Sequence, residues 1–169
     1  MYSIGEYVVK AGNGVCEIRD IVKMSVPGEV VRKDFYLLIP YYDRSTKIYV
    51  SVDGHKDVIR PVMTEKAAWD LIEQLPQMEE TWIENEKLRE QKYKEAIRSC
   101  DPNELVGIIK NMYYRKQQRM AEGRKNTAVD ERYFKMAEEI LHSEIAFSIK
   151  KSREELMQII EKTVSIVQD

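Results

Sequence analysis

The feature that most constrains this chain is a change in hydrophobic period near residue 62. Before that point, short runs of β-branched and aromatic residues alternate with turn-forming residues. After it, apolar residues recur every three or four positions, which is the spacing of a helix face. A strand turns alternate residues to one side and a helix every third or fourth, so the two patterns belong to separate structures. The sequence therefore predicts an α+β chain with two domains, residues 1–62 and 63–169.

The first domain is expected to consist of short β-strands. Five runs have the composition of strands: 7–9, 15–24, 35–39, 48–52 and the short 58–59. Gly12, Asn13 and Gly14 are expected to form a tight turn, since both residue types tolerate positive φ. The imperfect alternation of residues 15–24 indicates a bulge or a change of face. We expect these strands to form a small SH3/Tudor-like β-barrel.

The second domain is expected to be an all-α helical bundle. Residues that cap helix N-termini precede four of the predicted helices: Thr64, Asp101, Thr127 and Ser152. Glu104 and Glu155 each follow a cap by three residues, which predicts capping boxes at Asp101 and Ser152. A further helix is predicted over Glu79–Arg98, although this stretch is thin in apolar residues.

Composition excludes several classes of protein. Of the 169 residues, 33% are charged and 43% are hydrophobic, which is enough to bury a core. No apolar run approaches the roughly 20 residues that a membrane helix needs. The N-terminal residues lack the charged start and apolar stretch of a signal peptide, so we expect a cytoplasmic protein that does not contact a membrane.

The residues that usually carry catalysis or metal binding do not occur in suitable patterns. Cys16 and Cys100 are too few and too far apart for a zinc site or a disulfide framework, and are expected to be buried or idle thiols. His55 and His142 have no partners at metal-ligand spacing, and the glycines form no phosphate loop. We therefore expect no enzyme, no cofactor, no metal and no small-molecule substrate.

Positive charge is gathered in the helical domain, although the whole chain carries a net charge of −2. From Glu86 to Lys125 there are eleven Lys and Arg residues and six Asp and Glu residues. Trp82 stands just before this segment among charged residues, whereas Trp69 lies at the edge of an apolar stripe and is expected in the core. A basic helical segment with an aromatic residue at one end is typical of a nucleic-acid-binding surface. Because the chain is nearly neutral, such binding is expected to be local and weak by itself.

Short motifs occur along nearly the whole chain in a characteristic order. They are IGEYVV at 4–9, GNGV at 12–15, YLL at 36–38, IYVSV at 48–52, RSCD at 98–101, ELV at 104–106, IIK at 108–110 and RKQQR at 115–119. Each motif is weak alone, but their order and spacing resemble the CarD family of bacterial transcription regulators, also called CdnL. The resemblance implies an N-terminal Tudor-like domain, similar to the polymerase-interacting domain of the transcription-repair coupling factor, followed by a helical domain.

The resemblance also implies a mechanism. In this family the Tudor-like domain docks on the β subunit of RNA polymerase, and the helical domain reaches promoter DNA at the upstream fork of the opening bubble. A tryptophan wedges into the minor groove there and basic residues hold the phosphates, which stabilises the open complex. The polymerase-binding residues carried over to this chain are Tyr36, Lys47, Tyr49 and Ser51. Tyr49 stands where the family tends to carry Arg, and Ser51 where it carries Pro.

The DNA-binding residues carried over lie in the basic segment and just before it. They are Trp82, Arg89, Lys92, Lys94, Arg115, Lys116, Arg119, Arg124 and Lys125. Trp82 resembles the wedge but lies about one helical turn farther from Asp101 than the family pattern has it. Either the helix before Asp101 is a turn longer in this chain, or the wedge is displaced.

Two other functions stay open at the level of sequence. A Tudor-type domain can act as a protein–protein adaptor, and in that case the helical domain never touches DNA. An enzyme with an unrecognised site is the weakest alternative, because no catalytic constellation is present. Binding to fork-junction DNA that depends on salt separates the regulator from the adaptor.

Overall fold

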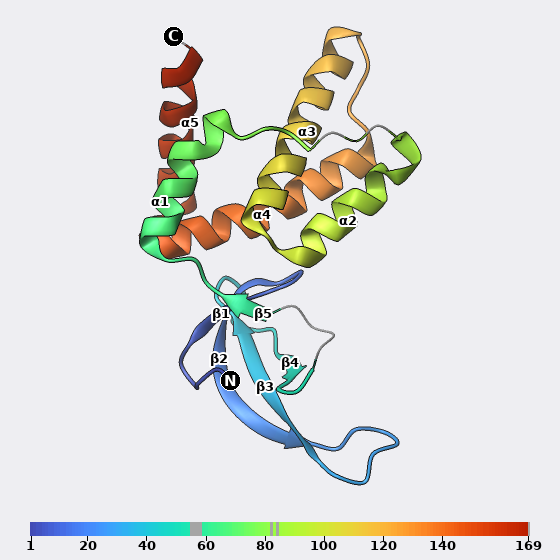
Figure 1. Cartoon of the computed structure of the whole chain (residues 1–169), viewed down its shortest axis with the longest axis vertical. Helices are drawn as coiled ribbons and strands as arrows, with labels where there is room; N and C mark the ends of the chain where they lie inside the picture. Colours follow the sequence, from blue (N-terminus) through green and yellow to red (C-terminus); the bar gives the residue numbers. More distant parts are fainter. Residues whose placement is uncertain (55–58, 82, 84, 169) are drawn as a thin grey trace. The chain divides into compact units, whose positions relative to one another are not determined.

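A computed structural model describes residues 1–54, 59–81, 83 and 85–168 of the chain. It consists of two compact units, Met1–Val62 and Met63–Asp169 (Figure 1). Three residues discussed above, His55, Val58 and Trp82, lie outside the described residues.

The first unit is a five-stranded antiparallel sheet, which confirms the predicted strands. The strands are β1 (Tyr7–Lys10), β2 (Gly14–Met24), β3 (Lys33–Pro40), β4 (Ile48–Ser51) and β5 (Ile59–Pro61). Their order in the sheet is β4-β3-β2-β1-β5, so β4 and β5 are the edge strands. Six buried side chains form the core of this unit: Val8, Cys16, Ile18, Tyr36, Leu38 and Val50.

Two local features of the sheet follow from the sequence. The β1–β2 turn contains Gly12 and Gly14 with φ of 79° and 71°, and the Asn13 N–H donates to the Lys10 carbonyl at 3.0 Å. In β2, Ile18 pairs with Leu38 but Asp20 pairs with Leu37, so Arg19 is an extra residue. This bulge is the irregularity that the alternation of residues 15–24 predicts.

The predicted β-barrel is not closed. In the described residues β4 pairs only with β3, and β5 pairs only with β1. These edge strands contain only four and three residues. A hydrophobic pattern indicates where strands occur, but closure depends on strand tilt and stagger, which the pattern does not contain.

The second unit contains five α-helices and two short 3₁₀ turns. The helices are α1 (Glu65–Gln74), α2 (Arg89–Ser99), α3 (Pro102–Ala121), α4 (Ala128–Ile149) and α5 (Arg153–Gln168), and the 3₁₀ turns are η1 (Leu75–Gln77) and η2 (Glu86–Leu88). Helix α4 contacts the four other helices. Its N-terminal half packs with α2 and α3, and its C-terminal half with α1 and α5 (Figure 1).

The predicted caps are confirmed at the helix N-termini. Hydroxyl oxygens of Thr64, Thr127 and Ser152 accept backbone hydrogen bonds at 3.1 Å, each from the residue three positions later. Asp101 accepts from two backbone N–H groups of the first turn of α3, at 2.8 and 3.1 Å. Glu104 does not close the predicted capping box directly. Its carboxylate accepts from the Ser99 hydroxyl, which in turn accepts from the Asp101 N–H.

The predicted helix over Glu79–Arg98 is wrong for its first third. The described residues from 78 to 85 are not helical, and α2 begins only at Arg89 after the 3₁₀ turn η2. The Asn85 side chain accepts from the Lys87 N–H at 2.9 Å and caps that turn, so the helical conformation starts after Asn85. Helix α2 therefore spans only Arg89–Ser99. We call the described residues of the non-helical stretch, 78–81, 83 and 85, the connector.

Candidate nucleic-acid interface

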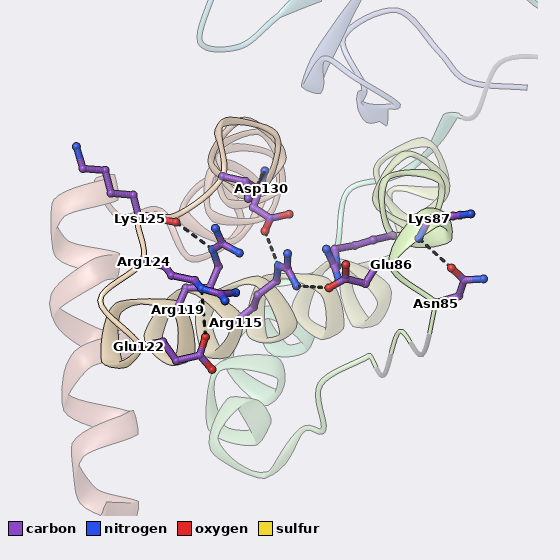
Figure 2. A network of polar contacts seen from close by, with 11 residues as sticks. Asn85, Glu86, Lys87, Arg115, Arg119, Glu122, Arg124, Lys125 and Asp130 are labelled. Carbon is purple, nitrogen blue, oxygen red and sulfur yellow. Dashed lines mark hydrogen bonds and ion pairs between the residues drawn. The ribbon is translucent and has the colours of Figure 1, made fainter.

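A network of charged side chains joins the start of α2 to α3 and α4. The Arg115 Nε donates to Asp130 at 2.7 Å, and its Nη1 lies 3.4 Å from the Glu86 carboxylate. Arg89 binds the same Glu86 oxygen at 3.1 Å. Figure 2 shows Arg115 of α3 between Asp130 and Glu86. We call Glu86, Arg89, Arg115 and Asp130 the anchoring network.

The position of Arg115 on α3 explains why it points inward. It follows Ile108 by seven residues and Met112 by three, and both of these side chains are buried. Residues at this spacing share one helix face, so Arg115 lies on the core side of α3. Asp130 likewise precedes the buried Tyr133 by three residues on α4. The Arg115 side chain is 20% exposed and that of Asp130 only 3%, so this pair is largely withdrawn from water.

The electrostatics of the network follow from these contacts. A hydrogen bond from Arg89, followed by its charge and then by Arg115, lowers the pKa of the Glu86 carboxyl. Beside the network, burial raises the pKa of the Tyr93 phenol, and the nearby Asp130 charge acts in the same direction. Glu86 is therefore an ionised partner of two guanidinium groups, and the arrangement joins η2 and α2 to the rest of the unit.

Four other predicted residues gather where α3 ends. They are Lys116, Arg119, Arg124 and Lys125, which we call the α3 basic end. The Arg119 Nε donates to the Lys125 main-chain carbonyl at 3.0 Å, and the Arg124 Nε lies 3.8 Å from the exposed Glu122 (Figure 2). In the part of the chain that the structure describes, neither Lys116 nor Lys125 has a carboxylate within 4 Å.

Chain geometry accounts for this cluster. Helix α3 ends at Ala121, and Gly123 with φ of 73° turns the chain so that the next residues fold back. Cations are favourable here because the C-terminal end of a helix carries partial negative charge. A carbonyl partner is neutral, so the bond made by Arg119 positions its guanidinium without cancelling the charge. The α3 basic end therefore offers positive charge to solvent.

Lys92 and Lys94 occupy the exposed surface of α2. Each has an acidic neighbour on its own helix: Lys92 lies 3.3 Å from Glu95, and Lys94 lies 3.2 Å from Glu90. Exposed pairs of this kind exchange readily with other partners because they contribute little free energy. These two lysines remain reachable, but their charge is locally balanced.

Of the two tryptophans, the structure describes Trp69 but not Trp82. Trp82 lies outside the described residues, so its predicted role as a wedge stays a prediction. Trp69 is partly buried on α1, beside the buried Ala68 and one turn before Ile72. Trp69 thus borders the core and is only partly buried, whereas the sequence predicts it within the core.

The predicted polymerase-binding residues divide between two faces of the sheet. Tyr49 and Ser51 share one face of edge strand β4, and Lys47 precedes them at the same two-residue spacing. Tyr49 is 45% exposed. Tyr36 lies opposite Val50 on the other face, is 3% exposed, and accepts a hydrogen bond from the Tyr2 N–H at 2.9 Å. Tyr36 is therefore a core residue of β3, the strand that pairs with β4.

Among residues 1–54, 59–81, 83 and 85–168, no group of three or more His, Cys, Asp or Glu side chains could hold a metal ion. Within the same residues, no helix has the length and apolar composition that crossing a membrane requires. Cys16 and Cys100 are both buried, as expected, and their thiols donate to the main-chain carbonyls of Gly14 and Ile97.

Sequence reasoning missed two residues, Asp130 in the helical unit and Leu37 in the sheet. Asp130 is not among the predicted site residues, yet its carboxylate accepts a hydrogen bond from Arg115. Its place on the buried stripe of α4 is the signal that a charged partner must face it. Leu37 lies opposite Tyr49 in the β3–β4 ladder and is partly exposed, so it extends the face that carries Tyr49.

Each of the two units matches the model of a known protein family. The model of the CarD-like/TRCF RID domain matches residues 2–63, and the model of the CarD C-terminal domain matches residues 70–161. This chain belongs to the CarD family. A comparison with curated proteins found no match. Membership confirms the resemblance drawn from the short motifs, and makes the chain a transcription-related protein that interacts with RNA polymerase.

Proposed function

We propose that this CarD-family protein docks on the β subunit of RNA polymerase and stabilises the promoter open complex by holding DNA at the upstream fork. One observation carries the proposal: the two family domains follow each other in order and together span residues 2–63 and 70–161. The protein acts as a non-enzymatic regulator in this proposal.

Docking is assigned to strand β4. An edge strand presents backbone N–H and C=O groups that have no neighbour in their own sheet, and a partner can pair with them. Lys47, Tyr49 and Ser51 line one face of this edge, and the partly exposed Leu37 adds apolar area beside Tyr49. An aromatic side chain at the centre of a contact contributes much of its binding free energy.

DNA contact is assigned to the α3 basic end together with Trp82. Lys116, Arg119, Arg124 and Lys125 supply attraction to phosphates that does not depend on base sequence. Lys92 and Lys94 add to it once they exchange their acidic neighbours for phosphates. Trp82 is proposed as the wedge, which acts at low cost at a fork where base pairs are already partly unstacked.

In this proposal Arg89 and Arg115 hold α2 in place and do not touch DNA, because both guanidinium groups already bind Glu86. Weak DNA contacts suffice, since docking on polymerase raises the local concentration of promoter DNA. This division agrees with a chain whose net charge is only −2.

The docking half is tested by binding of the full chain to purified RNA polymerase and to an isolated β-subunit fragment. Tyr49→Ala is expected to weaken both interactions by at least about tenfold, the loss typical of a central aromatic residue. Tyr113→Ala is the matched control, because Tyr113 is 50% exposed but lies on α3. Binding that is equal for the two variants would contradict docking through β4.

The adaptor alternative makes a different prediction in the same system. An adaptor binds polymerase through β4 but does not respond to charge changes in the helical unit. If variants of the α3 basic end leave promoter complexes unchanged while Tyr49→Ala abolishes docking, the adaptor function is the correct one.

A further inference from the structure

The connector lies against α3 in a way that its polar composition does not predict. The Thr81 N–H donates to the carbonyl of Gly107 at 3.0 Å, although Gly107 lies within α3 and its carbonyl belongs to a helix. One turn further along α3, the Lys110 ammonium donates to the Met78 carbonyl. Burial also lowers the pKa of Lys110. Two residues of the connector are thus bonded to α3.

Gly107 makes the close approach possible. It is buried in the interior of α3, where glycine costs about 1 kcal/mol relative to alanine. Its φ is not in the left-handed region, so no backbone conformation requires glycine there. A Cβ at this position would lie 2.2 Å from Thr81 Oγ1, 3.3 Å from Thr81 Cβ and 3.4 Å from Thr81 N. The absence of a side chain therefore makes room for Thr81.

The other end of the connector is also held. Asn85 caps the turn η2, and the next residue, Glu86, binds Arg89 and Arg115 in the anchoring network. Thr81 and Glu86 are consequently both bonded to residues of α3.

We propose that Gly107 is a positioning residue that seats the connector on α3 and so sets where the chain around Trp82 meets DNA. This role rests on the proposed function, because it concerns the same DNA contact. Gly107 itself touches no DNA; it acts through Thr81. Preorganisation of the connector lowers the entropy that DNA binding would otherwise cost.

Gly107→Ala in the full chain tests the proposal. The substitution favours the helix by about 1 kcal/mol, so folding is retained. The added methyl group, however, would lie 2.2 Å from Thr81 Oγ1, so the Thr81 side chain must move away from Gly107. Hydrogen exchange of the Thr81 amide is therefore expected to become about tenfold faster, since its bond to Gly107 opens more often. Open-complex lifetime in the presence of this variant is expected to fall toward the value without the protein. Gln117→Ala, on the exposed side of α3, is the matched control and should change neither quantity.

Rescue distinguishes positioning from a general effect on stability. Thr81→Ala removes the oxygen that lies nearest to the added methyl group, so the double variant Gly107→Ala/Thr81→Ala is expected to regain both slow exchange and long lifetime. Unchanged exchange at Thr81 in Gly107→Ala, or a lifetime that the second change does not restore, overturns the proposal. If the wild-type protein itself leaves open-complex lifetime unchanged, the proposed function fails instead. In that case the exchange measurements still decide whether Gly107 seats the connector.

Discussion

Arg115 and Arg119 are one helical turn apart on α3, yet their guanidinium groups bind partners of different charge. Arg115 binds the buried Asp130 and the ionised Glu86, so its charge is balanced within the protein. Arg119 donates to the Lys125 carbonyl, a neutral group, and keeps its full charge at the surface. The same contrast separates the anchoring network from the α3 basic end. A count of basic residues therefore does not measure the positive charge available to a binding partner. A carboxylate acceptor balances the charge of a basic side chain, whereas a carbonyl acceptor does not.

The largest expected effect comes from the anchoring network. Arg115→Ala leaves the Asp130 carboxylate buried without its cation, and we expect the free energy of unfolding to fall by about 3 kcal/mol. Denaturant unfolding followed by helical circular dichroism measures this. The paired change Arg115→Met/Asp130→Leu should recover most of the loss, because it removes both charges together. A loss of DNA affinity by Arg115→Ala at unchanged stability would reverse the roles assigned to the two groups.

A partly buried histidine, His142, predicts a dependence of stability on pH. Burial lowers the pKa of His142 on α4 to about 4, and the charge of Arg153 contributes. An unfolded histidine has a pKa near 6.5, so between pH 6.5 and 4 the unfolded chain binds more protons and stability falls as pH falls. His142→Gln should weaken this decline by up to about 3 kcal/mol at pH 4. His55 is present in both proteins, so the difference between the two unfolding curves reports His142. Parallel curves would show that His142 titrates normally.

Changes to the exposed α3 basic end are expected to weaken DNA binding without lowering the stability of the fold. Replacing Lys116, Arg119, Arg124 and Lys125 by Gln should weaken binding to fork-junction DNA by about tenfold or more, and should lower the salt dependence by about one for each phosphate contact removed. Fluorescence anisotropy at several salt concentrations measures both. The free energy of unfolding should stay within about 0.5 kcal/mol of wild type, as for other surface changes. An unchanged salt dependence would separate these residues from DNA.

The smallest effect is expected at the balanced lysines of α2. Lys92→Gln/Lys94→Gln removes two charges that Glu95 and Glu90 already offset. DNA affinity should fall by only about twofold and stability by less than about 0.5 kcal/mol. The same anisotropy titration compares this pair with the α3 basic end. A larger loss here than at the α3 basic end would place the DNA contact on α2.

The sequence predicts local structure well where one residue decides it. Thr64, Asp101, Thr127 and Ser152 begin their helices because a side-chain oxygen can satisfy a free N–H group within the same turn. The bulge in β2 is visible as a break in alternation. The start of α2 was misplaced because residues 79–85 carry no pattern that opposes a helix. Asn85, a favoured cap, was the overlooked signal.

Tertiary features were harder to predict from the sequence. Closure of the sheet depends on strand tilt, and the seat at Gly107 depends on a residue that is distant in sequence. The direction of Arg115, in contrast, could have been inferred, because it continues the stripe of Ile108 and Met112. A basic residue on a buried stripe requires an acidic partner, and Asp130 occupies the matching stripe of α4. Basic residues on the buried face of a helix should therefore be separated from those on its exposed face before DNA contacts are predicted.

The most direct test of the central claim is the lifetime of promoter open complexes after a competitor such as heparin is added. The account predicts that the wild-type protein prolongs this lifetime. The variant with Gln at Lys116, Arg119, Arg124 and Lys125 should lose most of the effect while still binding polymerase, and Arg115→Met/Asp130→Leu should keep it. Equal lifetimes for wild type and the variant with four Gln residues would contradict the claim that exposed cations at the end of α3 hold the DNA.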